Sequence, residues 1–261
     1  MTALPTGFGC HVANIGVKDD SDDFVVIVSD AAHPAAGVFT KSRFAGPSVT
    51  ISRRHLADRR ARGIVIVSKN ANVANGEVGH RDALELLSVV ADRIGGSPDE
   101  LLLASTGVIG RRYPMDRVRA GAAEIPSEPG GTDAVAAARG IMTTDTVPKV
   151  SERTIGRGPA RVVGIAKGVG MIEPDMATMI TVVLADAAVD PDTLDRVFRD
   201  VIDRTFNCVS IDTDTSTSDT AVVLASGAAG PPLSDSRSSR GVTTETVAPS
   251  SGTSESMRGV T

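Results

Sequence analysis

The stretch ARVVGIAKGVGMIEPDMATMITVVLA, residues 160–185, places a polar, glycine-containing segment between two apolar runs. The runs at 160–166 and 179–185 are short and rich in β-branched residues, which is typical of buried strands. The intervening segment, 167–178, carries a lysine, two glycines, a proline and two acidic residues. A strand, a loop with reactive side-chain types and a second strand are therefore predicted.

On either side of this unit, short apolar runs alternate with amphipathic patterns of helical spacing. Further strands are predicted at 24–28, 37–40, 64–67, 101–104 and 221–225. Helices are predicted over 79–94, 132–142 and 191–206, the first ended by Gly95-Gly96 and the last begun by Asp190-Pro191. The pattern indicates an α/β protein.

Composition narrows the class of function. Lys and Arg number 27 against 32 Asp and Glu, and this net charge of -5 argues against a dedicated nucleic-acid surface. Aromatic residues are scarce, with no Trp and with Tyr113 as the sole Tyr, which argues against base-stacking platforms. The core is expected to consist of Val, Ile, Leu and Ala.

The cysteines and the apolar runs indicate the cellular compartment in which the protein is expected. Cys10 and Cys208 are too far apart in sequence to form a disulfide framework or a zinc site, which favours a reducing cytoplasm. The N-terminus lacks the basic and apolar regions of a signal peptide, and no apolar run reaches the ~18 residues that span a bilayer. We expect a cytoplasmic protein without a membrane contact.

Patterns that bind metals or cofactors are incomplete. Gly168 and Gly170 follow a predicted strand but lack the rest of a dinucleotide or P-loop signature, so a tight turn is the simpler interpretation. Oxygen-bearing side chains alternate at 212–219 without the glycine and glutamate of a calcium loop. The four histidines are scattered, and no Gly-x-Ser-x-Gly motif nominates a serine. We expect no metal and no cofactor.

Four motifs together resemble one family. They are STGVIG at 105–110, MTTDT at 142–146, GIAKGVGMIEPDMAT at 164–178, and the segment 206–219 with its SIDTDTSTSD ending. In order and spacing they are similar to the ornithine acetyltransferases, which are the glutamate N-acetyltransferases of the cyclic arginine pathway. NANVA at 70–74 and FAGP at 44–47 add to this resemblance, which runs from about Gly7 to about Gly230.

The resemblance implies an α/β fold with layers in the order α-β-β-α, shared with self-processing aminopeptidases. It implies self-cleavage between Ala177 and Thr178, into an α chain of residues 1–177 and a β chain that begins at Thr178. Thr178 is then the N-terminal nucleophile, and Thr106 and Gly107 form the oxyanion hole. The substrate-binding positions that it implies are Thr144, Lys167 and Thr178, and two α and two β chains are expected to assemble as a heterotetramer.

The implied reaction is ping-pong transfer of acetyl from N-acetylornithine to glutamate, with no cofactor. A threonine hydroxyl needs a base to become a nucleophile, and the new α-amino group, with a pKa of about 8, supplies one. Lys167 either neutralises a substrate carboxylate or raises the neutral fraction of that amine.

The C-terminal region departs from the family pattern. The recognisable part of the β chain is 178–230, and 13 of the 31 residues in 231–261 are Ser or Thr, which predicts a disordered tail. The glutamate, asparagine and hydroxyl residues with which family members bind substrate further along have no counterpart, so we expect the fold to be incomplete at the C-terminus. Two alternatives remain: a non-catalytic remnant or partner subunit, and a self-processing amidohydrolase of the same fold.

Overall fold

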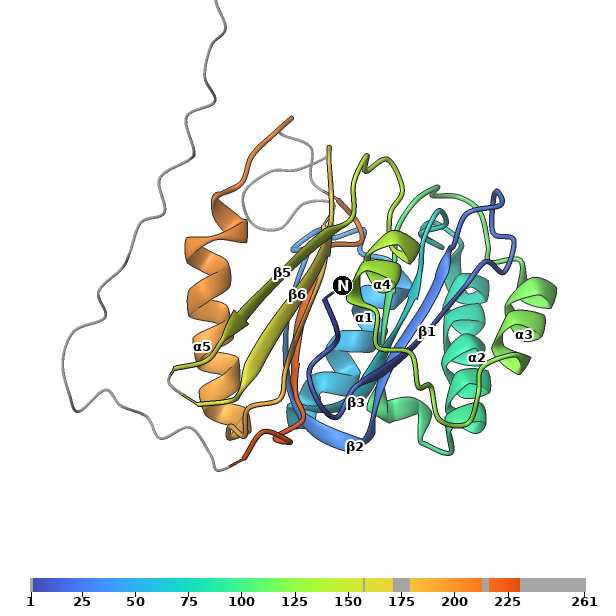
Figure 1. The fold of residues 1–261 in the computed structure, drawn as a ribbon. Helices are drawn as coiled ribbons and strands as arrows, with labels where there is room; N and C mark the ends of the chain where they lie inside the picture. Colours follow the sequence, from blue (N-terminus) through green and yellow to red (C-terminus); the bar gives the residue numbers. More distant parts are fainter. Residues whose placement is uncertain (1, 157, 171–178, 213–215, 231–261) are drawn as a thin grey trace, which may run out of the picture.

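The computed structural model describes residues 2–156, 158–170, 179–212 and 216–230 and shows an α/β protein (Figure 1). Its strands are β1 (Gly9–Ala13), β2 (Phe24–Phe39), β3 (Arg60–Val67), β4 (Leu101–Ser105), β5 (Lys149–Thr154), β6 (Arg161–Lys167), β7 (Ile180–Ala185) and β8 (Thr220–Ala225). Its helices are α1 (Pro47–His55), α2 (Gly76–Ile94), α3 (Met115–Ala123), α4 (Ala134–Gly140) and α5 (Pro191–Arg204).

These strands form one mixed sheet in the order β4-β3-β2-β8-β7-β6-β5, with β1 paired to β2. Two pairs are parallel: β3 and β4, which α2 connects, and β7 and β8, which α5 connects. The long strand β2 belongs to both halves of the sheet, because its first residues pair with β1 and β3 and its last with β8. Its register against β3 shifts between Val28 and His33, at the passage from one half to the other.

Three groups of buried side chains show that the two halves of the sheet face each other. Between the halves, Ile64 and Leu102 of the first share a core with Ile165 and Leu184 of the second. On the outer face of the first half, a second core includes side chains of α2 and α3; on the outer face of the second half, Phe198 of α5 belongs to a third. The layers therefore run α, β, β, α, with α5 on one side and α2 and α3 on the other (Figure 1).

Helix α1 covers the open edge of β4. The Ser52 hydroxyl donates to the Leu103 carbonyl at 2.8 Å and accepts the Leu103 N–H at 2.7 Å. The His55 Nδ1 lies 2.8 Å from the Leu101 carbonyl oxygen. Side chains of α1 thus replace the missing neighbouring strand and satisfy backbone groups that would otherwise be buried without partners.

The structure confirms the predicted α/β fold and its layer order. The two strands predicted at 24–28 and 37–40 are parts of the single strand β2, because the intervening residues stay extended through the change of partner. Strands β1 and β5 and helices α1 and α3 were not predicted. Strand β5 reads KVSERT and is mostly exposed, so it lacks the apolar pattern on which a strand prediction depends.

Several sequence expectations fall on residues that the structure does not describe. They include the expected cleavage bond, Ala177-Thr178, and the Ser/Thr-rich segment 231–261. Among the helices of the described ranges, none is long and apolar enough to cross a membrane.

Candidate active site

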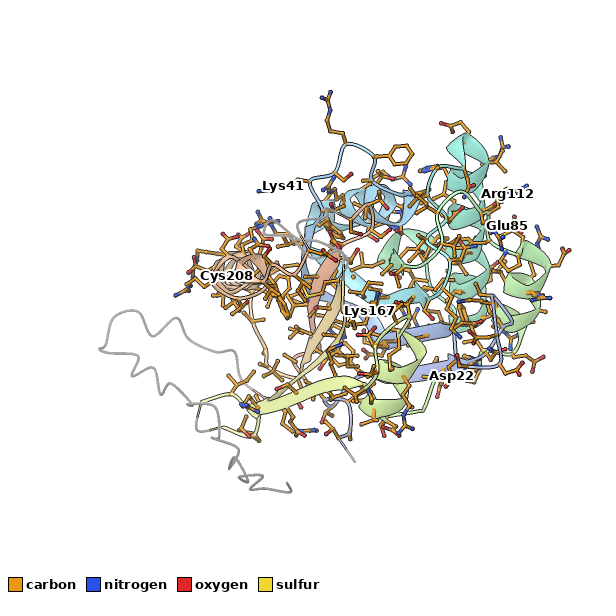
Figure 2. All side chains as sticks on the ribbon, turned by 90° about the horizontal axis from the view of Figure 1, so that it is seen from above. Asp22, Lys41, Glu85, Arg112, Lys167 and Cys208 are labelled. Atoms are coloured by element: carbon orange, nitrogen blue, oxygen red, sulfur yellow. The ribbon has the colours of Figure 1, made fainter. Side chains whose placement is uncertain are left out.

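An open cleft of about 1050 Å³ lies where the two halves of the sheet meet. Thr106 and Gly107, which follow the carboxyl end of β4, line it from the first half. Lys167, the last residue of β6, and Thr144, in the connection between α4 and β5, line it from the second. Viewed from above, Lys167 lies near the middle of the molecule, whereas Cys208 lies beside α5 at the periphery (Figure 2).

The turn at Thr106 and Gly107 is held by backbone hydrogen bonds that continue the parallel pairing of β3 and β4. The Thr106 N–H donates to the Val67 carbonyl at 3.1 Å, and the Val108 N–H donates to the Lys69 carbonyl at 3.2 Å. Between them, the N–H of Gly107 has no acceptor among the described residues. This turn therefore holds one free backbone donor at the cleft between two that are fixed.

Gly107 fits this turn because it has no side chain. Its φ is 129°, in the region that favours glycine, and a Cβ added to it would lie 2.2 Å from the Lys69 carbonyl carbon. The facing segment is also unusual, since Lys69, Asn72 and Ala74 all have positive φ. Such backbone conformations are costly for residues other than glycine and concentrate at functional sites.

Lys167 is buried in the floor of the cleft, with 3% of its surface exposed. Its Nζ donates to the Thr106 Oγ1 at 3.2 Å, so the two halves of the sheet are joined by a hydrogen bond between predicted site residues. Because the Thr106 hydroxyl accepts from Lys167, its own hydrogen remains available to a ligand. Burial lowers the pKa of Lys167, an effect that the charges of Asp145 and Asp219 oppose and that Lys149 reinforces.

Asp145 anchors the loop that carries Thr144. Its carboxylate accepts the Gly168 N–H at 2.9 Å and a hydrogen bond from the Lys149 ammonium. Burial tends to raise the pKa of Asp145, but these hydrogen bonds and the charge of Lys167 outweigh it, so the pKa lies below its ordinary value. The carboxylate thereby holds the loop of Thr144 against the end of β6.

Asp219 is a second carboxylate near Lys167, and it is completely buried. Its Oδ1 accepts the N–H of Met179 at 2.7 Å. Burial raises the pKa of Asp219 to about 7, against the lowering effects of the Met179 N–H, the Ser216 hydroxyl and Lys167. The site thus contains a buried lysine and two buried carboxylates, only one of which has a lowered pKa.

Lys69 connects the Gly107 turn to the acidic segment at the rim of the cleft. Its Nζ donates to the Asp19 carboxylate at 2.6 Å and to the Ser21 carbonyl at 2.7 Å. The hydrogen bonds from Lys69 and Ser21 lower the pKa of Asp19. This pair ties two loops of the first half together across the cleft wall.

The structure brings four of the predicted site residues into this one cleft: Thr106, Gly107, Thr144 and Lys167. Their roles stay predictions, and Ala177 and Thr178 lie outside the described residues. Residue spacing alone did not single out Lys69, Asp145 or Asp219 as site residues. Asp145 stands inside the MTTDT motif, which was a signal for it, whereas the role of Lys69 depends on a fold that only coordinates reveal.

A group of three or more His, Cys, Asp and Glu side chains placed to hold a metal ion is not found in the described part of the chain. The site presents hydrogen-bond donors, a buried lysine and carboxylates. Two donors next to a buried positive charge suit an anionic group or an oxygen that becomes negative during a reaction.

The layered α/β fold and the cleft define the class of this molecule: an α-β-β-α protein with a Thr-Gly turn and a buried lysine between the two halves of its sheet. The profile of the ArgJ family matches residues 9–248, and the chain belongs to the ArgJ family.

Three known proteins illustrate this relationship. Arginine biosynthesis bifunctional protein ArgJ 2 of Nostoc sp. is 56% identical over 88% of this chain and 59% of its own length. Glutamate N-acetyltransferase Oat2 of Streptomyces clavuligerus is 55% identical over 87% and 57%. The crystal structure of ornithine acetyltransferase complexed with ornithine, from Mycobacterium tuberculosis, matches with a TM-score of 0.55 and 29% identity over 65% of this chain and 92% of that one. The chain therefore spans less than two thirds of the length of the curated relatives.

Proposed function

We propose that this chain is a glutamate N-acetyltransferase that cleaves itself between Ala177 and Thr178. It would transfer acetyl from N-acetyl-L-ornithine to L-glutamate through an acetyl ester on Thr178. The observation that carries this proposal is the cleft that gathers Thr106, Gly107 and Lys167. The described residues on either side of 171–178 support it too: Gly170 lines the cleft, and the Met179 N–H donates to Asp219, whose charge acts on Lys167.

The names of similar proteins support the substrate class. One relative that is 55% identical is named glutamate N-acetyltransferase, and the ornithine acetyltransferase structure that is 29% identical holds ornithine. N-acetylornithine and glutamate both carry an α-carboxylate, which the buried Lys167 ammonium would neutralise. Thr144, at the wall of the cleft, would bind the same substrate beside it.

In the first half-reaction, the Thr178 Oγ attacks the acetyl carbonyl carbon of N-acetylornithine. The hydroxyl proton moves to the neutral α-amino group of Thr178, which passes it to the ornithine nitrogen as the C–N bond breaks. In the second, the neutral amine of glutamate attacks the ester and the proton returns to the Thr178 oxygen. No acetyl-CoA and no other cofactor is needed for this balance.

Each half-reaction passes through a tetrahedral intermediate with a negative oxygen. The free N–H of Gly107 and the Thr106 hydroxyl would donate to this oxygen, each contributing about 3 kcal/mol to transition-state stability. Lys167, which donates to the Thr106 Oγ1, would hold the rotamer of that hydroxyl. Both donors are positioned by β4 and its continuation, so little reorganisation accompanies the reaction.

The proposal extends to the substrates, the compartment and the assembly of the enzyme. We propose small-molecule substrates, a cytoplasmic enzyme, and an assembly of two α and two β chains after cleavage. Cleavage would leave residues 1–177 and 178–261 held together, because β7 and β8 pair with strands of the first segment.

Intact mass spectrometry of the purified chain tests the cleavage. We expect two species, residues 1–177 and 178–261, and one uncut species for Thr178→Ala. Thr181→Val is the matched control, since it removes a threonine hydroxyl from β7 itself and is expected to cut as the wild type does. An uncut wild-type chain would contradict the proposal.

Incubation of the cut protein with N-acetylornithine and labelled glutamate tests the transfer. We expect labelled N-acetylglutamate together with ornithine. Free acetate without N-acetylglutamate would identify an amidohydrolase, and correctly cut, folded protein without any product would identify a non-catalytic subunit.

A further inference from the structure

The carboxylate of Asp219 forms fewer hydrogen bonds with the described residues than its burial calls for. It is completely buried, and its Oδ1 accepts the Met179 N–H at 2.7 Å. The Ser216 hydroxyl lies close enough to lower the pKa of this carboxylate, but Oδ2 is buried and forms no hydrogen bond with the described residues. An incompletely bonded buried carboxylate destabilises a fold, so its retention near Lys167 points to a role in the site.

The strand register places this carboxylate at the level of Lys167. Lys167 pairs with Ile180 across β6 and β7, and Ile180 pairs with Thr220 across β7 and β8. Asp219 and Met179 each precede one of these residues in the chain, so they lie side by side at the end of the sheet where Lys167 ends β6. The charges of Asp219 and Lys167 each affect the pKa of the other.

Among the described residues, other charged groups near this pair come from the loop before β5, from β5 and from α1. Asp145, in the loop before β5, attracts Lys167, and Lys149 of β5 repels it. Arg53 of α1 donates to the backbone carbonyl of Thr40, and the Thr40 N–H donates to the backbone carbonyl of Asp219. Among these, Lys167 is the cation that interacts electrostatically with the Asp219 carboxylate.

We propose that Asp219 is a positioning residue of this site, which fixes Met179 through one carboxylate oxygen and keeps Lys167 protonated through its negative charge. The catalytic part of this inference rests on the proposed function, because Met179 directly follows the proposed nucleophile and Lys167 is the proposed carboxylate-binding residue. A buried ammonium needs a nearby negative charge to stay ionised. Asp145 supplies one such charge and Asp219 the second.

The pKa of about 7 for Asp219 makes both effects depend on pH. Above pH 7 the carboxylate is ionised, its bond to Met179 is charge-assisted, and it favours the protonated form of Lys167. Below pH 7 it binds a proton and both effects weaken. The site therefore has a working range between the protonation of Asp219 and the deprotonation of Lys167.

The hydrogen bond can be tested without any activity. Labelling with 15N-methionine gives backbone amide signals for the six methionines that follow Met1, and Met179→Leu identifies the signal of Met179. To exclude titration of a new Thr178 α-amino group, the comparison uses the uncut Thr178→Ala chain: we expect its Met179 amide proton to titrate with a midpoint near pH 7, and to stay constant once Asp219→Asn is added. A Met179 signal that is constant between pH 5.5 and 8.5 in Thr178→Ala would overturn the proposal.

The charge effect is tested by the pH profile of the glutamate KM. In Asp219→Asn the amide oxygen can still accept the Met179 N–H, so this variant removes the charge and keeps the bond. The KM should begin to rise at a pH at least one unit lower than in the wild type, because Lys167 loses its proton more easily. An unchanged alkaline limb would overturn the assignment.

The matched control is Asp186→Asn, at the opposite end of β7. Asp186 is 2% exposed and accepts backbone N–H groups from Arg161 at 2.6 Å and Thr6 at 3.2 Å. We expect this variant to keep the wild-type pH profile; an equal shift in both variants would indicate a general effect of buried carboxylates and contradict the proposal. A wild-type chain that neither cuts itself nor transfers acetyl would contradict the proposed function. In that case the Met179 titration still shows whether Asp219 positions β7.

Discussion

The two parallel strand pairs of the molecule contribute to the cleft in opposite ways. The pair β3 and β4, joined by α2, presents its carboxyl ends, followed by the turn at Thr106 and Gly107. The pair β7 and β8, joined by α5, presents its amino ends, preceded by Met179 and Asp219. The first pair supplies neutral donors fixed by backbone hydrogen bonds, whereas the second, with Lys167 of the adjoining β6, supplies buried charges.

Because of this difference, substitutions at the two strand pairs should depend on pH in different ways. Neutral donors depend on position alone, so substitutions at the first pair should act equally at every pH. Buried charges depend on one another, so substitutions at the second pair should act through pKa values and change with pH. Four substitutions test this division.

The largest effect is expected for Gly107→Ala. The added Cβ would lie 2.2 Å from the Lys69 carbonyl carbon, which forces the free N–H away from its position. We expect kcat for acetyl transfer to fall about 10³-fold, as for the loss of an oxyanion donor, with the same factor at pH 6.5 and 8.5. Steady-state kinetics on cut protein measure this loss.

Gly110→Ala is the control for that experiment. Gly110 also has positive φ, at 75°, but a Cβ there meets nothing within 4 Å. We expect a modest loss of stability, about 1 kcal/mol, and nearly unchanged kcat. Equal losses of activity in the two variants would show that the whole loop, and not the Gly107 donor, matters.

Thr106→Val should have the next largest effect. It removes the hydroxyl but keeps the shape of the side chain, and we expect kcat to fall about 10²-fold at every pH tested. Thr106→Ser retains the hydroxyl and is expected to stay within about threefold of the wild type. A loss that grows or shrinks with pH would break the division between the two strand pairs, since it would make Thr106 act through the charge of Lys167.

Asp219→Asn tests the second pair through stability. The folded pKa of about 7 lies above the ordinary Asp value of 3.8, so the wild-type contribution to stability is complete below pH 4 and is lost as pH rises through 7. The asparagine variant, which has no such loss, should gain on the wild type by about 2 kcal/mol between pH 5 and pH 8. Urea unfolding at the two pH values measures it, and a constant difference would refute the raised pKa.

The sequence predicts the Thr-Gly turn after β4, but it does not predict the pairing of buried charges beside β7 and β8. The β-branched runs predict the strands, and the STGVIG motif marks Thr106 and Gly107. The two halves face each other because β2 changes partner along its length, and no pattern in the sequence predicts that change. The buried pair of Lys167 and Asp219 is formed by strand register, so a carboxylate 52 positions away along the chain could not be assigned to that lysine from spacing.

Lys167→Met is expected to have the smallest effect of the four, and it separates the two functions that Lys167 combines. Methionine keeps the apolar length of the side chain but removes the charge that would neutralise the substrate carboxylate. We expect the KM for glutamate to rise about tenfold at pH 7, or about 1.4 kcal/mol, with a smaller effect at high pH, where the wild-type lysine also loses its proton. The decrease of the effect with pH follows because burial already lowers the pKa of Lys167.

Lys149→Met is the control. It removes a more exposed lysine that forms an ion pair with Asp145, the carboxylate that also attracts Lys167, and it should change KM by less than threefold. A fall in kcat without a rise in KM would instead assign Lys167 to the support of the Thr106 hydroxyl, and would place it functionally with the first strand pair although β6 belongs to the second half of the sheet.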